Sequence, residues 1–286
     1  MDTSILEEVI DQICKEADNP DYEPITELYF KLPTCFSALN YDGYAIRPQE
    51  LVVLATRPGM GKTAFINNLA LSTAENGLPT IYLSFSLDQK QLILKLLAIQ
   101  TNSSVTRWRL PENLSKYLEA AETLQKLPLR VCSSTDFSLD HLREQIKQMM
   151  GNDNRHALVI IDDLHLVLSE PAYIEAARKL KLLARELDIS VVITTSVSHW
   201  IEKRANKRPI LGDVQHDLGQ WADKVLSLYM ESYYDQDTDE GNLLELLILK
   251  NRSGDSNGTA ELIFDSSIGK IVTKPHNFDF SDTSSE

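Results

Sequence analysis

Residues 51–69, LVVLATRPGMGKTAFINNL, constrain the fold of this chain more than any other stretch. The apolar run from Leu51 to Ala55 has the length of a buried strand, and a helical pattern follows Thr63. Between them lies a glycine-containing loop that ends in Gly-Lys-Thr, the arrangement that a phosphate-binding loop requires. Its glycines let backbone N–H groups converge on phosphate oxygens, and the helix N-terminus adds a favourable dipole. The sequence therefore predicts that the chain binds a nucleoside triphosphate.

The end of this loop supplies the groups that a triphosphate and its metal ion need. Lys62 is predicted to reach the β- and γ-phosphates, and the hydroxyl of Thr63 to bind Mg²⁺. The pattern GxxxxGK[ST] departs at one position, because Thr56 stands where the first glycine is expected. The residues predicted to bind the nucleotide are Thr56, Arg57, Pro58, Gly59, Met60, Gly61, Lys62 and Thr63.

Composition indicates a soluble protein with one large core. At 286 residues, 43% of them hydrophobic, the chain is long enough for one full domain. No apolar run approaches the roughly 18 residues of a membrane span, and the N-terminus is too acidic for a signal peptide. Cys14, Cys35 and Cys132 lack metal-binding spacing and indicate small buried side chains in a reducing cytoplasm. The formal net charge of −14 means that any basic surface for nucleic acid must be local.

Strand and helix patterns alternate after the phosphate loop. Such alternation predicts βαβ units and an α/β fold with a mostly parallel sheet covered on both faces. From Val225 onward the pattern changes to consecutive strands, which predict an antiparallel extension of the same sheet. Strands are predicted at residues 80–85, 129–132, 157–161, 190–195, 225–230, 243–250, 260–264 and 270–273, and helices at 89–100, 112–127, 138–150 and 172–187.

The two ends of the chain differ from this domain, which is expected to span residues 21–275. Within residues 1–20, an amphipathic helix is predicted from Ser4 to Ala17, with Ser4 and Glu7 as a capping box. This helix either packs on its own domain or reaches a neighbouring subunit. Residues 276–286 are polar and acidic, which predicts a disordered tail or, alternatively, a segment that docks a basic partner.

Two carboxylates follow apolar strands and are candidates for catalysis. Asp162 ends the run 158–161, where a Walker-B acid would hold Mg²⁺ through water, although an acid there also fits an ordinary strand end. Asp88 follows the strand 80–85 and is the candidate to polarise the attacking water. The alternative for Asp88 is a cap for the helix at 89–100.

Short motifs spread along the chain match one family. They are residues 32–39 (LPTCFSAL), 55–63 (ATRPGMGKT), 85–88 (FSLD), 161–166 (IDDLHL), 202–209 (EKRANKRP) and 250–254 (KNRSG). In the same order, the DnaB-like replicative DNA helicases carry patterns close to IPTGFxxLD, AARPSMGKT, FSLE, IDYLQL, EQRADKRP and KQRNG. The chain therefore resembles the ATPase domain of these hexameric, RecA-fold motors over nearly its whole length.

The resemblance implies an ATP-dependent helicase of DNA replication. It implies movement on single-stranded DNA with 5′-to-3′ unwinding, and ATP and Mg²⁺ as the bound ligands. Lys62 and Thr63 would then bind the phosphates and Mg²⁺, and Asp162 would be the Walker-B acid. Asp88 stands at the position of the family's catalytic glutamate, and His165 at the position of a glutamine that senses the γ-phosphate.

The resemblance also implies assembly into a ring, which has six subunits in the family. Lys250 and Arg252 stand at the positions of finger residues that reach the nucleotide of the adjacent subunit, although both also fit a solvated strand end. Because an arginine finger raises the rate about 10³–10⁵-fold in comparable NTPases, hydrolysis would depend on assembly. The helix Ser4 to Ala17 stands where the family has a linker helix that docks on the neighbouring subunit. The family's separate N-terminal helical domain is expected to be missing.

Several positions differ from the family and weaken the expectation of processive unwinding more than that of ATP binding. Asp88 is one methylene shorter than the family's glutamate, and Ser196 replaces a glutamine. In the DNA-contacting loop, here residues 212–223, the expected arginine is Gln215, which should weaken binding to single strands. The remaining basic candidates for DNA binding are Lys203, Arg204, Lys207 and Arg208, which also fit a solvated helix end.

These differences leave two other functions open. The first is an ATP-binding accessory or scaffold ring that assembles with a replication protein and has little or no unwinding activity. Asp88, His165 and Gln215 favour this alternative, whereas Lys250 and Arg252 favour the motor. The second is a RecA-like recombination or signalling ATPase, against which the KNRSG segment argues.

Overall fold

The structure is a computed structural model that describes residues 31–279, without residues 42, 105, 108, 109, 152–155, 236, 239 and 240. For residues 111, 112 and 275–279 only the backbone is described. The chain from Lys31 onward forms one compact unit. The predicted helix from Ser4 to Ala17 and residues 280–286 of the predicted tail lie outside the described residues, so both stay predictions.

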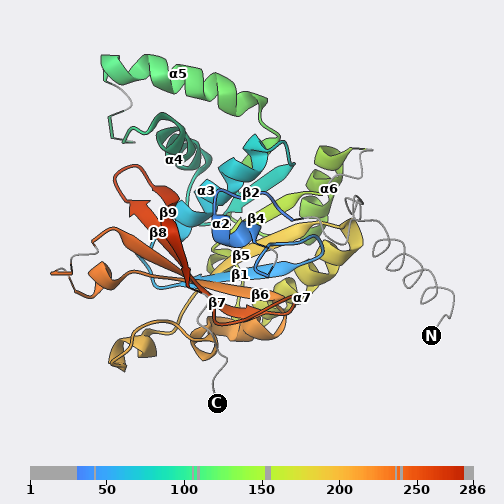
Figure 1. Cartoon of the computed structure of the whole chain (residues 1–286). Helices are drawn as coiled ribbons and strands as arrows, with labels where there is room; N and C mark the ends of the chain where they lie inside the picture. The colour runs from blue at the N-terminus through green and yellow to red at the C-terminus, as the bar shows by residue number, and fades with distance from the viewer. Residues whose placement is uncertain are drawn as a thin grey trace, which may run out of the picture. The chain divides into compact units, whose positions relative to one another are not determined.

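A nine-stranded sheet runs through this unit (Figure 1). Neighbouring strands are parallel from β3 to β6, and β7, β8 and β9 extend the sheet in antiparallel fashion. The order across the sheet is β3 (Leu129–Ser133), β2 (Thr80–Ser84), β4 (Leu158–Asp162), β5 (Ser190–Ser196), β1 (Leu51–Thr56), β6 (Lys224–Tyr229), β7 (Leu243–Asn251), β8 (Thr259–Asp265) and β9 (Lys270–Asp279). The predicted α/β fold, with its parallel sheet and antiparallel extension, is confirmed.

Helices cover both faces of the sheet. On β1, Val52 packs in one core cluster with Phe65 of α3, and Val53 packs in another with Tyr173 of α7. Because successive side chains of a strand point to opposite faces, the unbroken apolar run of β1 is buried only where both faces are covered. Within the described ranges, none of the helices is both long and apolar enough to cross a membrane. The helices are α2 (Ser37–Asn40), α3 (Lys62–Glu75), α4 (Gln89–Thr101), α5 (Pro111–Lys126), α6 (Leu139–Met150) and α7 (Glu170–Leu187), with 3₁₀ turns η2 (Leu164–Leu166), η3 (His199–Lys203), η4 (Leu211–Asp213), η5 (Gln215–Gln220) and η6 (Glu231–Tyr233).

The last strand is longer than the sequence predicts. β9 continues to Asp279, with Phe278 opposite Ala260 and Asp279 opposite Thr259. The backbone at these residues finds partners on β8, although its side chains are too polar to give a strand pattern. Residues 276–279, which the sequence assigns to the tail, thus belong to β9.

A buried ion pair fixes the start of β6 beside the start of β1. Lys224 is only 1% exposed, and its Nζ donates to Glu50 Oε1 at 2.5 Å and to Ser253 Oγ at 2.5 Å. Burial lowers the pKa of the Lys224 ammonium, while the Glu50 carboxylate opposes that shift. An ammonium so deeply buried depends on its carboxylate partner.

We expect Glu50→Gln to reduce the free energy of unfolding by about 3 kcal/mol, because it leaves the Lys224 charge buried without its carboxylate partner. Urea unfolding of the full chain measures the loss. The matched control is Glu186→Gln, which breaks the exposed ion pair with Arg143 and should cost about 0–1 kcal/mol. Equal losses in the two variants would contradict a special role for the buried pair.

Candidate nucleotide-binding site

The phosphate loop joins the end of β1, in the middle of the sheet, to the start of α3. Gly59 and Gly61 have φ of +86° and +80°, a left-handed backbone that favours glycine. A Cβ added at Gly59 would lie 3.2 Å from the ring of Tyr233, and one at Gly61 would lie 3.5 Å from Phe264. Backbone conformation at both positions and close packing at Gly59 therefore require these glycines.

Other residues of the loop face the protein and hold its shape. Met60 is fully buried and packs with Tyr229 and Leu247. Arg57 donates from Nε to Glu202 Oε1 at 2.8 Å. Thr56 is 1% exposed, so its side chain belongs to the sheet, whereas Pro58 and Gly59 are exposed. Of the eight residues predicted to bind the nucleotide, Arg57 and Met60 thus have side chains that hold the loop against the rest of the protein.

Asp162 ends β4 as a fully buried carboxylate. Its Oδ1 accepts a hydrogen bond of 2.7 Å from Thr194 Oγ1, and its Oδ2 accepts one of 3.5 Å from Ser86 Oγ. Burial, reinforced by the adjacent charge of Asp163, raises the pKa of Asp162 to about 6. A divalent cation would favour the ionised carboxylate, so this side chain fits the predicted metal ligand.

Asp163 is a second carboxylate of the site, and sequence reasoning gave it no role. Lys62 Nζ forms its ion pair with Asp163 Oδ1 rather than with Asp162. Alternation along β4 would point residue 163 away from Asp162, but Asp163 has a left-handed φ of +57°. The backbone N–H of Asp163 donates to Thr194 Oγ1 at 2.9 Å. The two successive acids after the apolar run were the signal that was available in the sequence.

Asp88 is exposed and begins α4. Its Oδ1 accepts a hydrogen bond of 2.8 Å from the backbone N–H of Gln91, whose side chain accepts from the backbone N–H of Asp88 at 3.3 Å. This reciprocal arrangement is a capping box. The capping role, one of the two alternatives for this residue, is therefore present, and the catalytic role stays a prediction.

Comparison with known proteins decides the family. Residues 31–273 match the DnaB-like helicase C terminal domain. The chain belongs to this family. It is 28% identical over 264 residues to the replicative DNA helicase DnaB of Geobacillus stearothermophilus, covering 87% of this chain and 58% of that protein. It is 30% identical over 255 residues to a probable plasmid replicative DNA helicase of Chlamydia psittaci, covering 84% and 55%.

Solved structures agree with this assignment. A solved ATPase domain superposes with a TM-score of 0.84 at 25% identity, covering 94% of this chain and 99% of that one. A DnaB-like replicative helicase, solved for its interactions with primase, superposes with a TM-score of 0.83 at 26% identity, covering 94% and 67%. The family resemblance and the RecA-like fold are confirmed, and with them nucleotide use. The chain spans little more than half the length of these two helicases.

His165, where the family was expected to have glutamine, lies at the edge of the site. Its Nδ1 is 3.9 Å from Asp163 Oδ1 and has no hydrogen-bond partner within the described part of the chain. Burial lowers the pKa of this imidazole. The ring lies 6.3 Å from that of His216, whose φ of +63° is left-handed. His165 therefore connects the phosphate site with η5, which lies within the predicted DNA-contacting loop.

Lys250 and Arg252 lie far from the phosphate loop of their own chain. The backbone N–H of Arg252 donates to the carbonyl of Asp223, and that of Asp223 donates to the carbonyl of Leu51. Arg252 is thus level with the start of β1, whereas the loop follows Thr56, five residues and about 17 Å along the strand. These two residues are not brought together with Lys62 within one subunit.

Both cations instead hold the end of η5. Lys250 Nζ donates to the carbonyls of Gly219 at 2.6 Å and Ala222 at 2.8 Å. Arg252 Nη2 donates to the carbonyl of Gln220 at 2.9 Å. Burial, followed by the nearby Arg252 charge, lowers the pKa of Lys250. The predicted finger residues and the predicted DNA loop are therefore in direct contact.

The predicted DNA-binding arginines already have carboxylate partners. Arg204 Nη2 lies 2.6 Å from Asp213 Oδ2, and Arg208 Nη2 lies 2.5 Å from Glu245 Oε1. A second bond, from Arg208 Nε to Glu245 Oε2 at 2.7 Å, makes the latter pair bidentate. These contacts neutralise much of the charge that would attract DNA.

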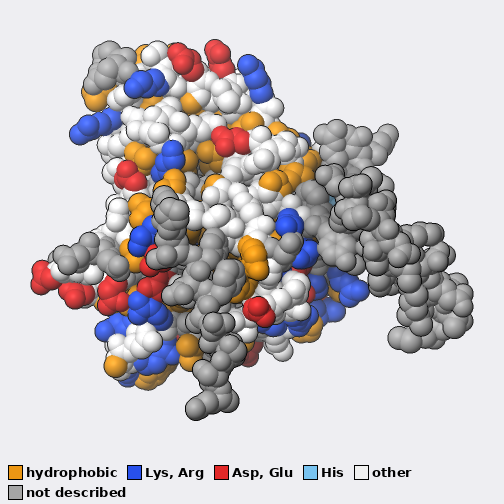
Figure 2. Space-filling model, in the orientation of Figure 1, with side chains coloured by type: hydrophobic (Ala, Val, Ile, Leu, Met, Phe, Trp, Pro, Cys, Tyr) orange, Lys and Arg blue, Asp and Glu red, His pale blue; other side chains and the backbone are white. Residues whose placement is uncertain are grey.

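The two lysines of the same segment lie over aromatic rings. Lys203 Nζ is 3.8 Å from the centroid of Trp200, which is 59% exposed, and Lys207 Nζ is 5.1 Å from that of Tyr234. Figure 2 shows Lys and Arg side chains at the lower left, where Figure 1 has the segment between β5 and β6. Gln215 lies at the start of η5. A DNA-binding role for these residues stays a prediction.

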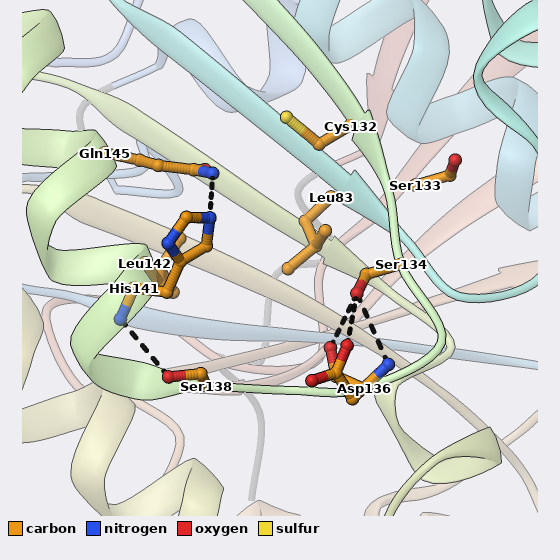
Figure 3. Close-up of a pocket in the computed structure, with 9 residues that line it drawn as sticks. All are labelled: Leu83, Cys132, Ser133, Ser134, Asp136, Ser138, His141, Leu142 and Gln145. Carbon is orange, nitrogen blue, oxygen red and sulfur yellow. Dashed lines mark hydrogen bonds between the residues drawn. The ribbon is translucent and has the colours of Figure 1, made fainter.

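A separate hollow of about 410 Å³ opens beside β3 and α6 (Figure 3). Its polar side chains bind one another: Ser134 Oγ donates to Asp136, and His141 pairs with Gln145 at 2.7 Å. Burial raises the pKa of the Cys132 thiol in its wall, which makes a reactive thiolate less accessible. These contacts satisfy the lining groups, so we assign the hollow no ligand.

The hydroxyl of Thr194 forms hydrogen bonds with both Asp162 and Asp163. Its removal therefore tests whether these bonds stabilise the site. We expect Thr194→Val to lower the free energy of unfolding by about 1–3 kcal/mol, because it removes buried partners of Asp162 and of the Asp163 backbone. Urea unfolding measures the effect. The control is Thr56→Val, which removes a buried hydroxyl without a hydrogen-bond partner among the described residues. A comparable loss in the control would contradict the assigned role.

Proposed function

We propose that this chain is an ATP-driven DNA translocase and helicase of replication that works as a ring of identical subunits. The observation that carries the proposal is a phosphate loop whose lysine forms an ion pair with Asp163, next to the buried Asp162 that ends β4, in a chain of the DnaB-like helicase family. Its matched relatives are replicative helicases by name. The free thiols Cys35 and Cys132 agree with a cytoplasmic location.

The nucleotide in this proposal is ATP with Mg²⁺. Lys62 would move from Asp163 to the β- and γ-phosphates, and backbone N–H groups at the start of α3 would hold phosphate oxygens. The Thr63 hydroxyl and the Asp162 carboxylate are oxygen ligands of the kind that Mg²⁺ takes. The metal ion would neutralise charge on the phosphates.

A ring of six subunits is proposed because the finger residues need a second subunit. Lys250 and Arg252 lie at the edge of the sheet opposite their own phosphate loop, which supports action on the nucleotide of a neighbour. The predicted helix from Ser4 to Ala17 would dock on that neighbour. Assembly would thereby complete each site.

Single-stranded DNA is the proposed substrate along which the ring moves, with η5 and the segment between β5 and β6 facing it. Phosphates would compete with Asp213 and Glu245 for Arg204 and Arg208, so binding should be weak and sensitive to salt.

These same ion pairs favour the second candidate function, an ATP-binding accessory or scaffold ring with little unwinding. Because one structural neighbour was solved for its interactions with primase, a replication protein is a proposed partner in both cases.

The test is steady-state ATP hydrolysis with and without single-stranded DNA. We expect DNA to stimulate the wild type several-fold, Lys62→Ala to abolish turnover, and Arg252→Ala to lower it at least about 10³-fold. Arg178→Ala, which removes an exposed arginine of α7, is the control and should leave turnover unchanged. Mixing Lys62→Ala with Arg252→Ala subunits should restore activity, because some sites then combine an intact loop with an intact finger.

Two outcomes would count against the motor. Tight ATP binding with negligible turnover and no response to DNA would favour the accessory ring. Full activity of Arg252→Ala, or no recovery in the mixture, would contradict a finger that acts between subunits.

A further inference from the structure

The carboxylate nearest to the phosphate-binding lysine is not the one that the sequence suggested for catalysis. We propose that the carboxylate of Asp163, rather than that of Asp88, holds the water that attacks the γ-phosphate and accepts its proton. This proposal rests on the ATP hydrolysis proposed above. It is carried by the ion pair between Lys62 and Asp163, together with the use of Asp88 as a helix cap.

The first argument is the position of Lys62. A phosphate-loop lysine reaches the β- and γ-phosphates, so a group in contact with its Nζ lies close to where the terminal phosphate binds. The side chains of Lys62 and Asp163 are only 16% and 12% exposed. When phosphate oxygens attract the ammonium, the Asp163 carboxylate is released beside them. The ion pair therefore holds the Asp163 carboxylate next to the position that the γ-phosphate would occupy.

The second argument is the backbone that directs Asp163 into the site. Its φ of +57° is left-handed, which is uncommon for residues other than glycine although aspartate tolerates it, and such conformations occur at functional sites. The hydrogen bond from its N–H to Thr194 Oγ1 holds this turn. A regular strand would turn residue 163 to the opposite face. The left-handed turn thus brings two successive carboxylates to one site.

The third argument is that the carboxylates of Asp162 and Asp163 differ in their hydrogen bonding. Asp162 is fully buried and receives hydrogen bonds on both oxygens, from Thr194 and Ser86, which fixes it as a metal ligand requires. Asp163 is anchored through its backbone, and no hydrogen bond to its Oδ2 is found in the described part of the chain. That oxygen is available to accept a hydrogen bond from water.

Asp88 is poorly placed for the same task. Its Oδ1 accepts the N–H of Gln91 at 2.8 Å and thereby starts α4. The side chain is exposed, so water around it is not held apart from bulk solvent. To act on the phosphate, the carboxylate would have to leave the cap, which would leave a helix N–H without its partner.

The reaction step balances with these groups. The water oxygen bonds to Pγ while the bond from Pγ to the β–γ bridging oxygen breaks, and that electron pair stays on the β-phosphate of ADP. One water proton passes to Asp163 and then to solvent. The products are ADP, inorganic phosphate and a proton, and Lys62 compensates charge on the phosphates throughout.

The experiment compares Asp163→Asn with Asp88→Asn in the full chain. Both changes are isosteric: the amide oxygen in Asp163→Asn can still accept from Lys62, and the side chain in Asp88→Asn still caps a helix. With Mg²⁺ and ATP, we expect Asp163→Asn to lower kcat at least about 100-fold. Asp88→Asn should lower it by less than about 3-fold, because the cap is kept. Asp163→Glu should recover part of the loss.

A second measurement does not need turnover. Fluorescent methylanthraniloyl-ADP is bound with Mg²⁺ alone and then with aluminium fluoride, which mimics the transferring phosphoryl group and its attacking water. Wild type and Asp88→Asn should form a slowly dissociating complex with aluminium fluoride. Asp163→Asn should bind the ADP analogue as well as wild type does and fail to form that complex.

The outcomes separate this proposal from the function on which it rests. If the wild type traps aluminium fluoride without turning over ATP, the hydrolytic function fails while loss of trapping in Asp163→Asn still supports the assignment. If Asp163→Asn weakens binding of the ADP analogue itself, Asp163 serves only to position Lys62 and the proposal is overturned. Loss of turnover and trapping in Asp88→Asn, with both kept in Asp163→Asn, overturns it as well.

Discussion

The parallel alignment of β1, β4 and β5 is the constraint on which the candidate site depends. Parallel neighbours end at the same edge of a sheet, so residues far apart in sequence meet there. Lys62 follows β1, Asp162 ends β4 and Thr194 lies near the end of β5. The burial of these strands on both faces keeps their ends in register. The packing of the core on both faces of the sheet therefore also determines the geometry of the site.

Much of the fold was predictable because it follows from short-range patterns. The apolar run of β1, the glycines of the loop and the alternation of strand and helix specify a parallel sheet with a phosphate loop. The orientation of Asp163 was not predictable, since it depends on one backbone dihedral that reverses the strand's alternation. Asp88 was ambiguous for a different reason. The same carboxylate before a helix suits a cap and a catalytic acid, and its contact with Gln91 shows the cap.

Contacts between distant segments also set the electrostatics of the proposed DNA surface. In the sequence Arg208 resembles a free cation in a basic segment, but its bidentate partner Glu245 comes from β7. Asp213, the partner of Arg204, lies nine residues away in a turn without a strong sequence pattern. Counting charges along the chain therefore overestimates the basic character of this surface. Some of the acidic residues behind the net charge of −14 therefore lie where DNA binding was expected.

Such pairing would lower the affinity of this surface for DNA without excluding binding. When a DNA phosphate replaces Asp213 or Glu245, a guanidinium exchanges one oxyanion partner for another, and a carboxylate is left to be solvated. The net gain per contact is then smaller than for a free arginine, and binding depends on many contacts made together. A ring would supply that multiplicity by presenting the same segment from each subunit. Weak contacts within one subunit are thus compatible with a motor, provided that the ring forms.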